Sequence, residues 1–305
     1  MSLSYNVPEN KKIRVIIDTD AACEADDPFA IAHALMCRKF DVKGICAEQF
    51  NEPRSVRKSY DEIGTVLSLM KLDVPFFMGE DGALKDIPEG TISPAAEFII
   101  SEAEKDGEGI PPLYLLCLGA ITNVASAIRK KPAITAKMNV IWIGGQDYEN
   151  VRPDFREFNA GNDIEAINLV ISSGVKFTQI PVNVYGAMRI SLAEIQDRIA
   201  PCGDIGKHLF ENMTGYNMTD RAFWTAGESW SIGDSPAVGI ALDPDCGRYI
   251  YRKPPVFNDD TTYAADASCN DPGFSRKIKV YTSVDSRFII EDLIAKLRLL
   301  YCPIM

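Results

Sequence analysis

The chain has 305 residues, of which 46% are hydrophobic and 25% are charged, and both shares are typical of a folded globular protein. Its 43 acidic residues outnumber the 32 basic ones and give a formal net charge of -11 at pH 7. Such a negative field disfavours nucleic acid or an anionic membrane as a partner, and favours a neutral or cationic ligand or an acidic metal site.

The eight cysteines form no CxxC pair, and several lie in apolar runs such as 116–118, where free thiols pack as small hydrophobic side chains. We therefore predict no zinc site and a reducing, cytoplasmic location. The first residues lack the charged segment and apolar stretch of a signal peptide, and no apolar run is long enough for a membrane-spanning helix.

Strand-like apolar runs alternate with segments of helical periodicity along the first two thirds of the chain. The strands are predicted at 13–17, 42–47, 74–78, 113–118, 140–143 and 176–180, and the helices at 28–36, 56–72, 95–103, 121–129 and 164–173. Helical segments dominate from about 190 to 242, followed by strand-like runs at 248–256 and 277–282 and a helix at 286–300. This order predicts an α/β fold with a mainly parallel sheet flanked by helices, a helical insertion in the C-terminal third, and a single domain over 1–305.

An acidic segment directly follows the first predicted strand. Five carboxylates fall within residues 18–27, namely Asp18, Asp20, Glu24, Asp26 and Asp27. Ligands bind at the carboxyl ends of strands in open α/β sheets, and a bound divalent cation would relieve the repulsion between these groups. Their all-oxygen chemistry favours calcium, magnesium or manganese. The alternative, a solvated loop that caps a helix, explains one or two acids but not five.

These residues resemble the nucleoside hydrolases of the inosine-uridine preferring type, in which Asp-Thr-Asp closes the first strand and Asp-Asp opens the first helix. Other segments similar to that family follow in its order over nearly the whole chain, at 44–51, 118–125, 143–145, 150–153, 157–159, 163–166, 233–236 and 287–288. The resemblance implies the open α/β fold of the family and hydrolysis of the bond between ribose and a nucleobase. It also implies a calcium cofactor, a ribonucleoside substrate and a homodimer or homotetramer.

Carried over residue by residue, the resemblance implies that Asp20 is both a metal ligand and the general base that activates water. Asp27, Asp234 and the backbone carbonyl of Leu118 would complete the protein ligands, and Asp18 would support the loop from behind. The residues that would hold the ribose hydroxyls are Asp26, Asn51, Asn150, Glu157 and Asn159. Plainer roles remain open for several of them, as helix starts, turn residues or surface acids.

The acidic loop departs from the family pattern in its length. Five residues, 21–25, separate Asp20 from the Asp26-Asp27 pair, where the family usually has three. Glu24 thereby becomes a candidate for an extra metal ligand or a sugar contact.

A second departure concerns the leaving base. Gly233 stands where the family has a histidine that protonates or steers the base, and the two histidines of the chain, His33 and His208, lie elsewhere in the sequence. Trp224 and Trp230 precede Asp234 and are candidates for stacking on the base, which favours a purine or another good leaving group. Structural packing is the alternative for both indoles, and Tyr216 and Asp220 are weaker candidates for contacts with the base.

Two other functions remain open from the sequence. Asp18-Thr19-Asp20 also fits the Asp-x-Asp of haloacid-dehalogenase-like phosphatases, although Ala22 stands where that class has threonine or valine. The missing histidine also fits a non-catalytic ribose- or nucleoside-binding protein on the same scaffold, whereas retention of Asp20, Asp27 and Asp234 favours metal chemistry.

Overall fold

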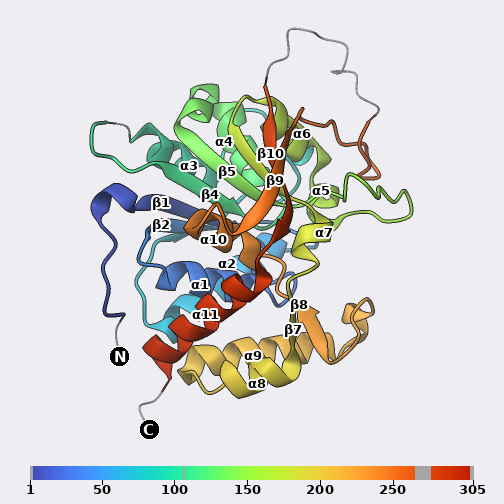
Figure 1. Ribbon diagram of the computed structural model, residues 1–305. Coiled ribbons are helices and arrows are strands. Elements are labelled where there is room, and N and C mark those ends of the chain that lie inside the picture. The colour runs from blue at the N-terminus through green and yellow to red at the C-terminus, as the bar shows by residue number, and fades with distance from the viewer. Residues whose placement is uncertain (1–2, 106, 265–275, 303–305) are drawn as a thin grey trace.

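The computed structural model describes residues 3–105, 107–264 and 276–302 (Figure 1). Its centre is an eight-stranded sheet of order β3-β2-β1-β4-β5-β6-β10-β9, parallel throughout except for the β10–β9 pair. The strands are β1 (Ile13–Thr19), β2 (Phe40–Ala47), β3 (Phe76–Phe77), β4 (Leu113–Cys117), β5 (Met138–Ile143), β6 (Lys176–Ile180), β9 (Gly247–Arg252) and β10 (Ile278–Val284). The predicted α/β class and the mainly parallel sheet are confirmed.

Helices cover both faces of the sheet (Figure 1) and enclose two separate apolar cores. On one face pack α1 (Asp27–Met36), α2 (Ser55–Met70), α10 (Ser235–Leu242) and α11 (Ser286–Tyr301). On the other pack α3 (Pro94–Glu104), α4 (Thr122–Lys130) and α6 (Ile164–Ser172). The shorter helical elements there and in the loops are α5 (Phe158–Asn162), α7 (Val182–Tyr185), η1 (Glu9–Lys11), η2 (Leu84–Asp86) and η3 (Pro132–Lys137).

Residues 189–231 form a lobe beside the sheet. It contains β7 (Arg189–Ser191), α8 (Leu192–Arg198), α9 (Gly203–Asn217), η4 (Asp220–Ala222) and β8 (Ser229–Ser231). Because β7 and β8 pair antiparallel, the lobe is closed by a small sheet as well as by helices. The predicted helical segment does extend to Leu242, but it leaves the lobe after residue 231. Its last helix, α10, is apolar on all sides and packs in the main body against α1 and α11.

The strand predicted at 248–256 ends at Arg252, because Pro254 and Pro255 follow and lack the N–H groups that a sheet requires. No helix of the described residues is long and apolar enough to cross a membrane.

Two features of the fold prepare a ligand site. The strands β2 and β3 lie on one side of β1, and β4 and the strands after it lie on the other side. The strand order therefore reverses between β1 and β4. In addition, α1 and α10 both begin at the carboxyl edge of the sheet, each with a proline in its first turn. The residues at their N-caps are Asp26 and Asp234, so the fold brings two distant acidic segments to one place.

Candidate functional site

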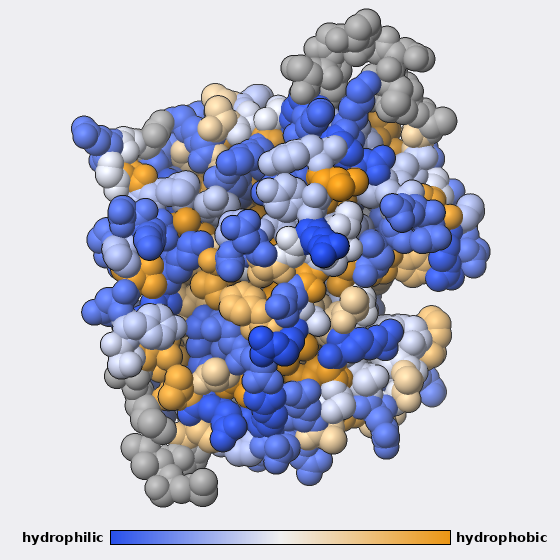
Figure 2. Space-filling model, viewed as in Figure 1, coloured by the Kyte–Doolittle hydropathy of each residue, from blue (hydrophilic) through white to orange (hydrophobic). Residues whose placement is uncertain are grey.

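A small cavity of about 100 Å³ lies at this reversal point, where open α/β sheets bind their ligands. The space-filling view shows a hollow at the right edge of the molecule, between the body of the sheet and the lobe of residues 189–231 (Figure 2). Eight of the twelve site residues predicted from the sequence line the cavity, namely Asp20, Glu24, Asp26, Asp27, Leu118, Glu157, Asn159 and Asp234. The fold thus brings together residues more than 200 positions apart.

Three aspartates form the acidic centre of the cavity. Asp26, Asp27 and Asp234 are buried, and each offers a carboxylate oxygen within 4.8 Å of the others. Thr19 donates its hydroxyl to Asp27, and the N–H of Gly233 donates to Asp26 Oδ2 at 2.8 Å. Hydrogen bonds thus fix the orientation of two of the three carboxylates, and the arrangement is suited to a hard cation with oxygen ligands.

Asp20 lines the same cavity and is 4% exposed. Its side chain lies against Gly119, the second residue after β4, so closely that a Cβ atom at Gly119 would be 2.5 Å from Asp20 Oδ1. Glycine at 119 therefore leaves the space in which the Asp20 carboxylate lies beside the Leu118 backbone.

Burial and mutual repulsion govern the protonation of these acids. Burial is the largest cause of a raised pKa in each of them, and repulsion by neighbouring carboxylates raises the pKa further in Asp20, Glu24, Asp26 and Asp234. Burial raises the pKa of Asp27 to about 6, although hydrogen bonds from Thr19 and Asp234 oppose the rise, and that of Glu24 to about 7. A bound divalent cation would favour the ionised forms and offset both causes.

Both carboxylate oxygens of Glu157 accept hydrogen bonds at the N-terminus of α5. Its Oε2 accepts the N–H groups of Gly145 and Ala160, each at 2.9 Å, and its Oε1 accepts the Tyr185 hydroxyl at 2.8 Å. Burial raises the pKa of Glu157, and these hydrogen bonds oppose the rise. Glu157 is therefore a buried helix cap and not a surface acid, and its orientation is fixed.

Asn159 connects two strand ends across the cavity. Its Nδ2 donates to the Leu118 carbonyl at 2.6 Å and to the Ile143 carbonyl at 3.0 Å. A carbonyl oxygen has two lone pairs, so the Leu118 oxygen can accept this bond and still face a cation.

Asp18 lies behind the cavity among fully buried polar groups. Its Oδ1 accepts Asn123 Nδ2 at 2.8 Å, and the Asn123 N–H donates to Glu48 Oε2 at 3.0 Å. Among the described residues Asp18 Oδ2 has no hydrogen-bond partner, and burial raises the pKa of Asp18 to about 7. The bond between Asp18 and Asn123 thus connects the end of β1, where the acidic loop begins, to helix α4.

Two predicted ribose contacts lie outside the cavity lining. Asn51 is exposed in the loop after β2, with a left-handed φ of 56°, and its N–H donates to Gln49 Oε1 at 2.6 Å. Asn150 is exposed and donates to Asp147 Oδ2 at 2.8 Å. Their contacts with a substrate stay predictions.

The two candidate indoles differ in environment. Trp230 is 2% exposed in β8, whereas Trp224 is 50% exposed, with 6.3 Å between the two ring centroids. Next to Trp224, Arg221 pairs with Glu52 of the loop after β2 at 3.2 Å. The 218–228 segment therefore reaches across to the loop that carries Asn51. Neither indole lines the cavity, and a contact of Trp224 or Trp230 with a base stays a prediction.

None of the described residues that line the cavity is a histidine. His33 is buried in α1 with its Nε2 2.7 Å from Asp292, and His208 pairs with Glu62 at 2.7 Å. The space beside Gly233 is instead bordered by the Tyr185 ring, whose Cδ2 would be 3.2 Å from a Cβ at 233. Sequence reasoning missed Tyr185, although its position just after β6 places it at the same edge of the sheet.

The chain is similar to known proteins over most of its length. The family model described as "Inosine-uridine preferring nucleoside hydrolase" matches residues 15–288. A protein of Schizosaccharomyces pombe is 24% identical over 212 residues, which are 60% of this chain and 65% of that protein. The pyrimidine-specific ribonucleoside hydrolase RihA of Salmonella paratyphi A is 27% identical over 273 residues, 80% of each chain. The structure of a purine-preferring ribonucleoside hydrolase from Gardnerella vaginalis superposes with a TM-score of 0.77 at 20% identity, covering 94% of this chain and 98% of that one.

Proposed function

Because the chain belongs to the inosine-uridine preferring nucleoside hydrolase family, we propose that it hydrolyses the N-glycosidic bond of ribonucleosides to ribose and free base. The observation that carries this proposal is the convergence of Asp20 with Asp26, Asp27 and Asp234 in one buried cavity. We further propose a calcium cofactor, a cytoplasmic role in purine or pyrimidine salvage, and a homodimer or homotetramer.

The donor set fits a calcium ion. Asp20, Asp27, Asp234 and the Leu118 carbonyl would hold it, with Asp26 beside them and Glu24 as a further ligand from the longer loop. All of these donors are oxygens, and buried carboxylates with raised pKa values are stabilised by a cation. When bound, calcium favours the ionised form of a neighbouring water and helps to orient the sugar.

Each residue of the site then has a separate role in a reaction with an oxocarbenium-like transition state. Asp20 accepts the proton of the attacking water, and Asp26 accepts a hydrogen bond from a ribose hydroxyl. Glu157 and Asn159 hold further hydroxyls, and their existing hydrogen bonds fix them in place before the substrate arrives. Asn51 and Asn150 would reach the sugar from the exposed loops.

Calcium binding is expected to depend on Asp27. In calorimetric titration with calcium, Asp27→Asn should weaken affinity by at least about tenfold, because it removes one charge from a site of converging carboxylates. The matched control is Asp41→Asn, which alters an acid outside the cavity and should leave the affinity within about twofold. Equal calcium affinity in the wild type and Asp27→Asn would show that the ion binds elsewhere.

Gly119→Ala is expected to damage catalysis without unfolding the protein. The added methyl group would meet Asp20 Oδ1 at 2.5 Å and displace the proposed base, so kcat should fall by about 10²-fold. Gly215→Ala is the control, because a Cβ there has nothing within 4 Å in an exposed part of α9. If Gly119→Ala keeps full kcat in the assay of base release, the geometry of Asp20 does not matter to the reaction.

The leaving group should strongly affect the rate. Because no histidine lines the cavity within the described chain, departure of the base depends mainly on its own stability. We expect nitrophenyl riboside to be cleaved at least about 10²-fold faster than uridine, since general acid catalysis typically contributes that much or more. Equal kcat/KM values for the two substrates would show that another group of the protein protonates the leaving base.

The family match disfavours the phosphatase alternative. A non-catalytic nucleoside-binding protein remains the second candidate, favoured by the absence of histidine from the described cavity lining. Nucleoside binding without turnover, in both the wild type and Asp20→Asn, would support it.

A further inference from the structure

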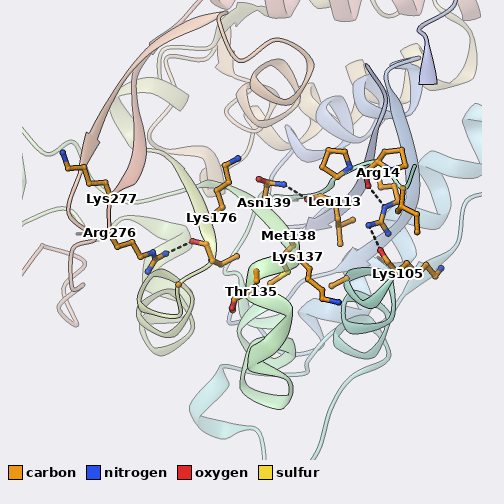
Figure 3. Close-up of a pocket in the computed structure, with 17 residues that line it drawn as sticks. Arg14, Lys105, Leu113, Thr135, Lys137, Met138, Asn139, Lys176, Arg276 and Lys277 are labelled. Atoms are coloured by element: carbon orange, nitrogen blue, oxygen red, sulfur yellow. Dashed lines mark hydrogen bonds between the residues drawn. The ribbon is translucent and has the colours of Figure 1, made fainter. Parts of the chain in front are cut away.

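A second and larger cavity of about 640 Å³ opens at the opposite edge of the sheet (Figure 3). Its walls come mainly from segments that precede or begin strands β4, β5, β6 and β10, at 110–113, 135–139, 174–176 and 276–277. Since the acidic cavity lies where parallel strands end, the two cavities are separated by the length of the strands. Its volume is within the range of small-molecule sites.

The charge of this cavity is opposite to that of the acidic one. Six cationic side chains line it, namely Arg14, Lys105, Lys137, Lys176, Arg276 and Lys277, and no acidic residue is among its described lining. A cavity of this sign is unexpected in a chain of net charge -11. The two edges of the sheet therefore carry fields of opposite sign.

Nearby groups neutralise only part of this positive charge. Arg14 and Lys105 both contact the buried carboxylate of Glu102. In contrast, Lys176 and Lys277 are exposed, and no carboxylate of the described ranges pairs with either. In Figure 3, Lys176, Arg276 and Lys277 lie on one side of the cavity, and Arg14 and Lys105 on the other.

Arg276 has a structural role that does not use all of its donors. Its Nη1 and Nη2 donate to the carbonyls of Ile171 and Val175, at 2.7 and 2.6 Å, at the C-terminal end of α6. A guanidinium has five N–H donors, and carbonyl partners leave its charge uncompensated. On the neighbouring strand β10, burial lowers the pKa of Lys279, repulsion by Lys176 lowers it further, and Asp245 opposes both effects.

We propose that this cavity binds a small anion with two or more phosphate groups, held mainly by Lys176, Arg276 and Lys277. Together these residues carry three positive charges, which suit several charged oxygens better than a single carboxylate, and the guanidinium fork can bind phosphate through two parallel hydrogen bonds. A long polyanion such as nucleic acid is disfavoured, because the positive charge is confined to one cavity of an acidic protein.

The test uses inorganic pyrophosphate and ADP as probes, titrated calorimetrically into the purified full-length protein at about 50 mM salt. We expect a Kd of about 10–100 µM for pyrophosphate, weakened several-fold at about 200 mM salt. The double variant Lys176→Ala/Lys277→Ala should raise the Kd at least about tenfold for both probes. The matched control Lys11→Ala/Lys85→Ala removes the same charge outside the cavity and should change the Kd less than about twofold.

An arm with Asp27→Asn separates this cavity from the acidic one. Pyrophosphate affinity should be unchanged in that variant, because the anion binds at the other edge of the sheet. The proposal is overturned by no detectable heat up to about 5 mM pyrophosphate. It is equally overturned if Lys176→Ala/Lys277→Ala and Lys11→Ala/Lys85→Ala weaken pyrophosphate binding to the same extent. The same holds if Asp27→Asn abolishes pyrophosphate binding while Lys176→Ala/Lys277→Ala keeps it.

Discussion

Replacing Asp20 with asparagine is expected to lower kcat for nucleoside hydrolysis by about 10² to 10⁴-fold, the range that general base catalysis contributes. Asparagine keeps the size of the side chain but cannot accept the proton of the attacking water. KM should change little when calcium is saturating, because Asp26, Glu157 and Asn159 hold the proposed sugar site independently. The measurement is the initial rate of free base release, with circular dichroism to verify the fold.

The control for this variant is Asp41→Asn, an acid outside the cavity, which should retain full activity. Because Asp20 is also a proposed ligand, calcium affinity must be measured in parallel and the assay run well above the new dissociation constant. If Asp20→Asn then keeps kcat within about fivefold of the wild type, a different group activates the water.

Removal of the metal is expected to make stability strongly dependent on pH. Burial raises the pKa of Asp27 to about 6 and of Glu24 to about 7, whereas their ordinary values of 3.8 and 4.5 apply to the unfolded chain. Between these values the folded state keeps protons that the unfolded chain has released, so stability falls as pH rises from about 4 to 7. The metal-free protein should therefore melt at least about 5 °C lower at pH 8 than at pH 5.

Saturating calcium should remove most of this loss, because the ion binds the ionised carboxylates of the folded state alone. The stabilisation by calcium, measured as the difference in Tm with and without chelator, should accordingly increase with pH. Asp27→Asn should reduce that difference at pH 8, whereas Asp41→Asn should not. A calcium effect on Tm that is equal at pH 5 and pH 8 would contradict the proposed ligands.

Sequence patterns could predict the elements that position the site. The apolar run of β1 followed by Asp18 and Asp20 indicated both a strand and the edge at which it ends, since periodicity and charge are local signals. The Asp-Ser-Pro segment at 234–236 indicated a helix start for the same reason. Because α/β sheets bind ligands at the carboxyl ends of strands, these local signals indicated a ligand site at Asp20, whereas Leu118 and Asp234 were assigned to it only through the resemblance to nucleoside hydrolases.

Contacts between distant segments could not be predicted in this way. Nothing in the local sequence indicates that Gly119 leaves room for Asp20, or that the Tyr185 hydroxyl binds Glu157. Burial of Trp230 beside an exposed Trp224 likewise depends on the pairing of β7 with β8. The cationic cavity was also missed, because its lysines and arginines are scattered along the sequence and meet only where parallel strands begin.

Calcium-dependent hydrolysis of ribonucleosides can be measured by incubating the full-length protein with calcium and a panel of ribonucleosides, and determining free base by chromatography. A chelator-treated sample provides the metal-free comparison. We expect release of base from at least one nucleoside, abolished by the chelator and restored by added calcium. If folded, calcium-bound protein releases no base from any nucleoside, the proposed function is contradicted, and a binding protein or a hydrolase for another glycoside takes its place.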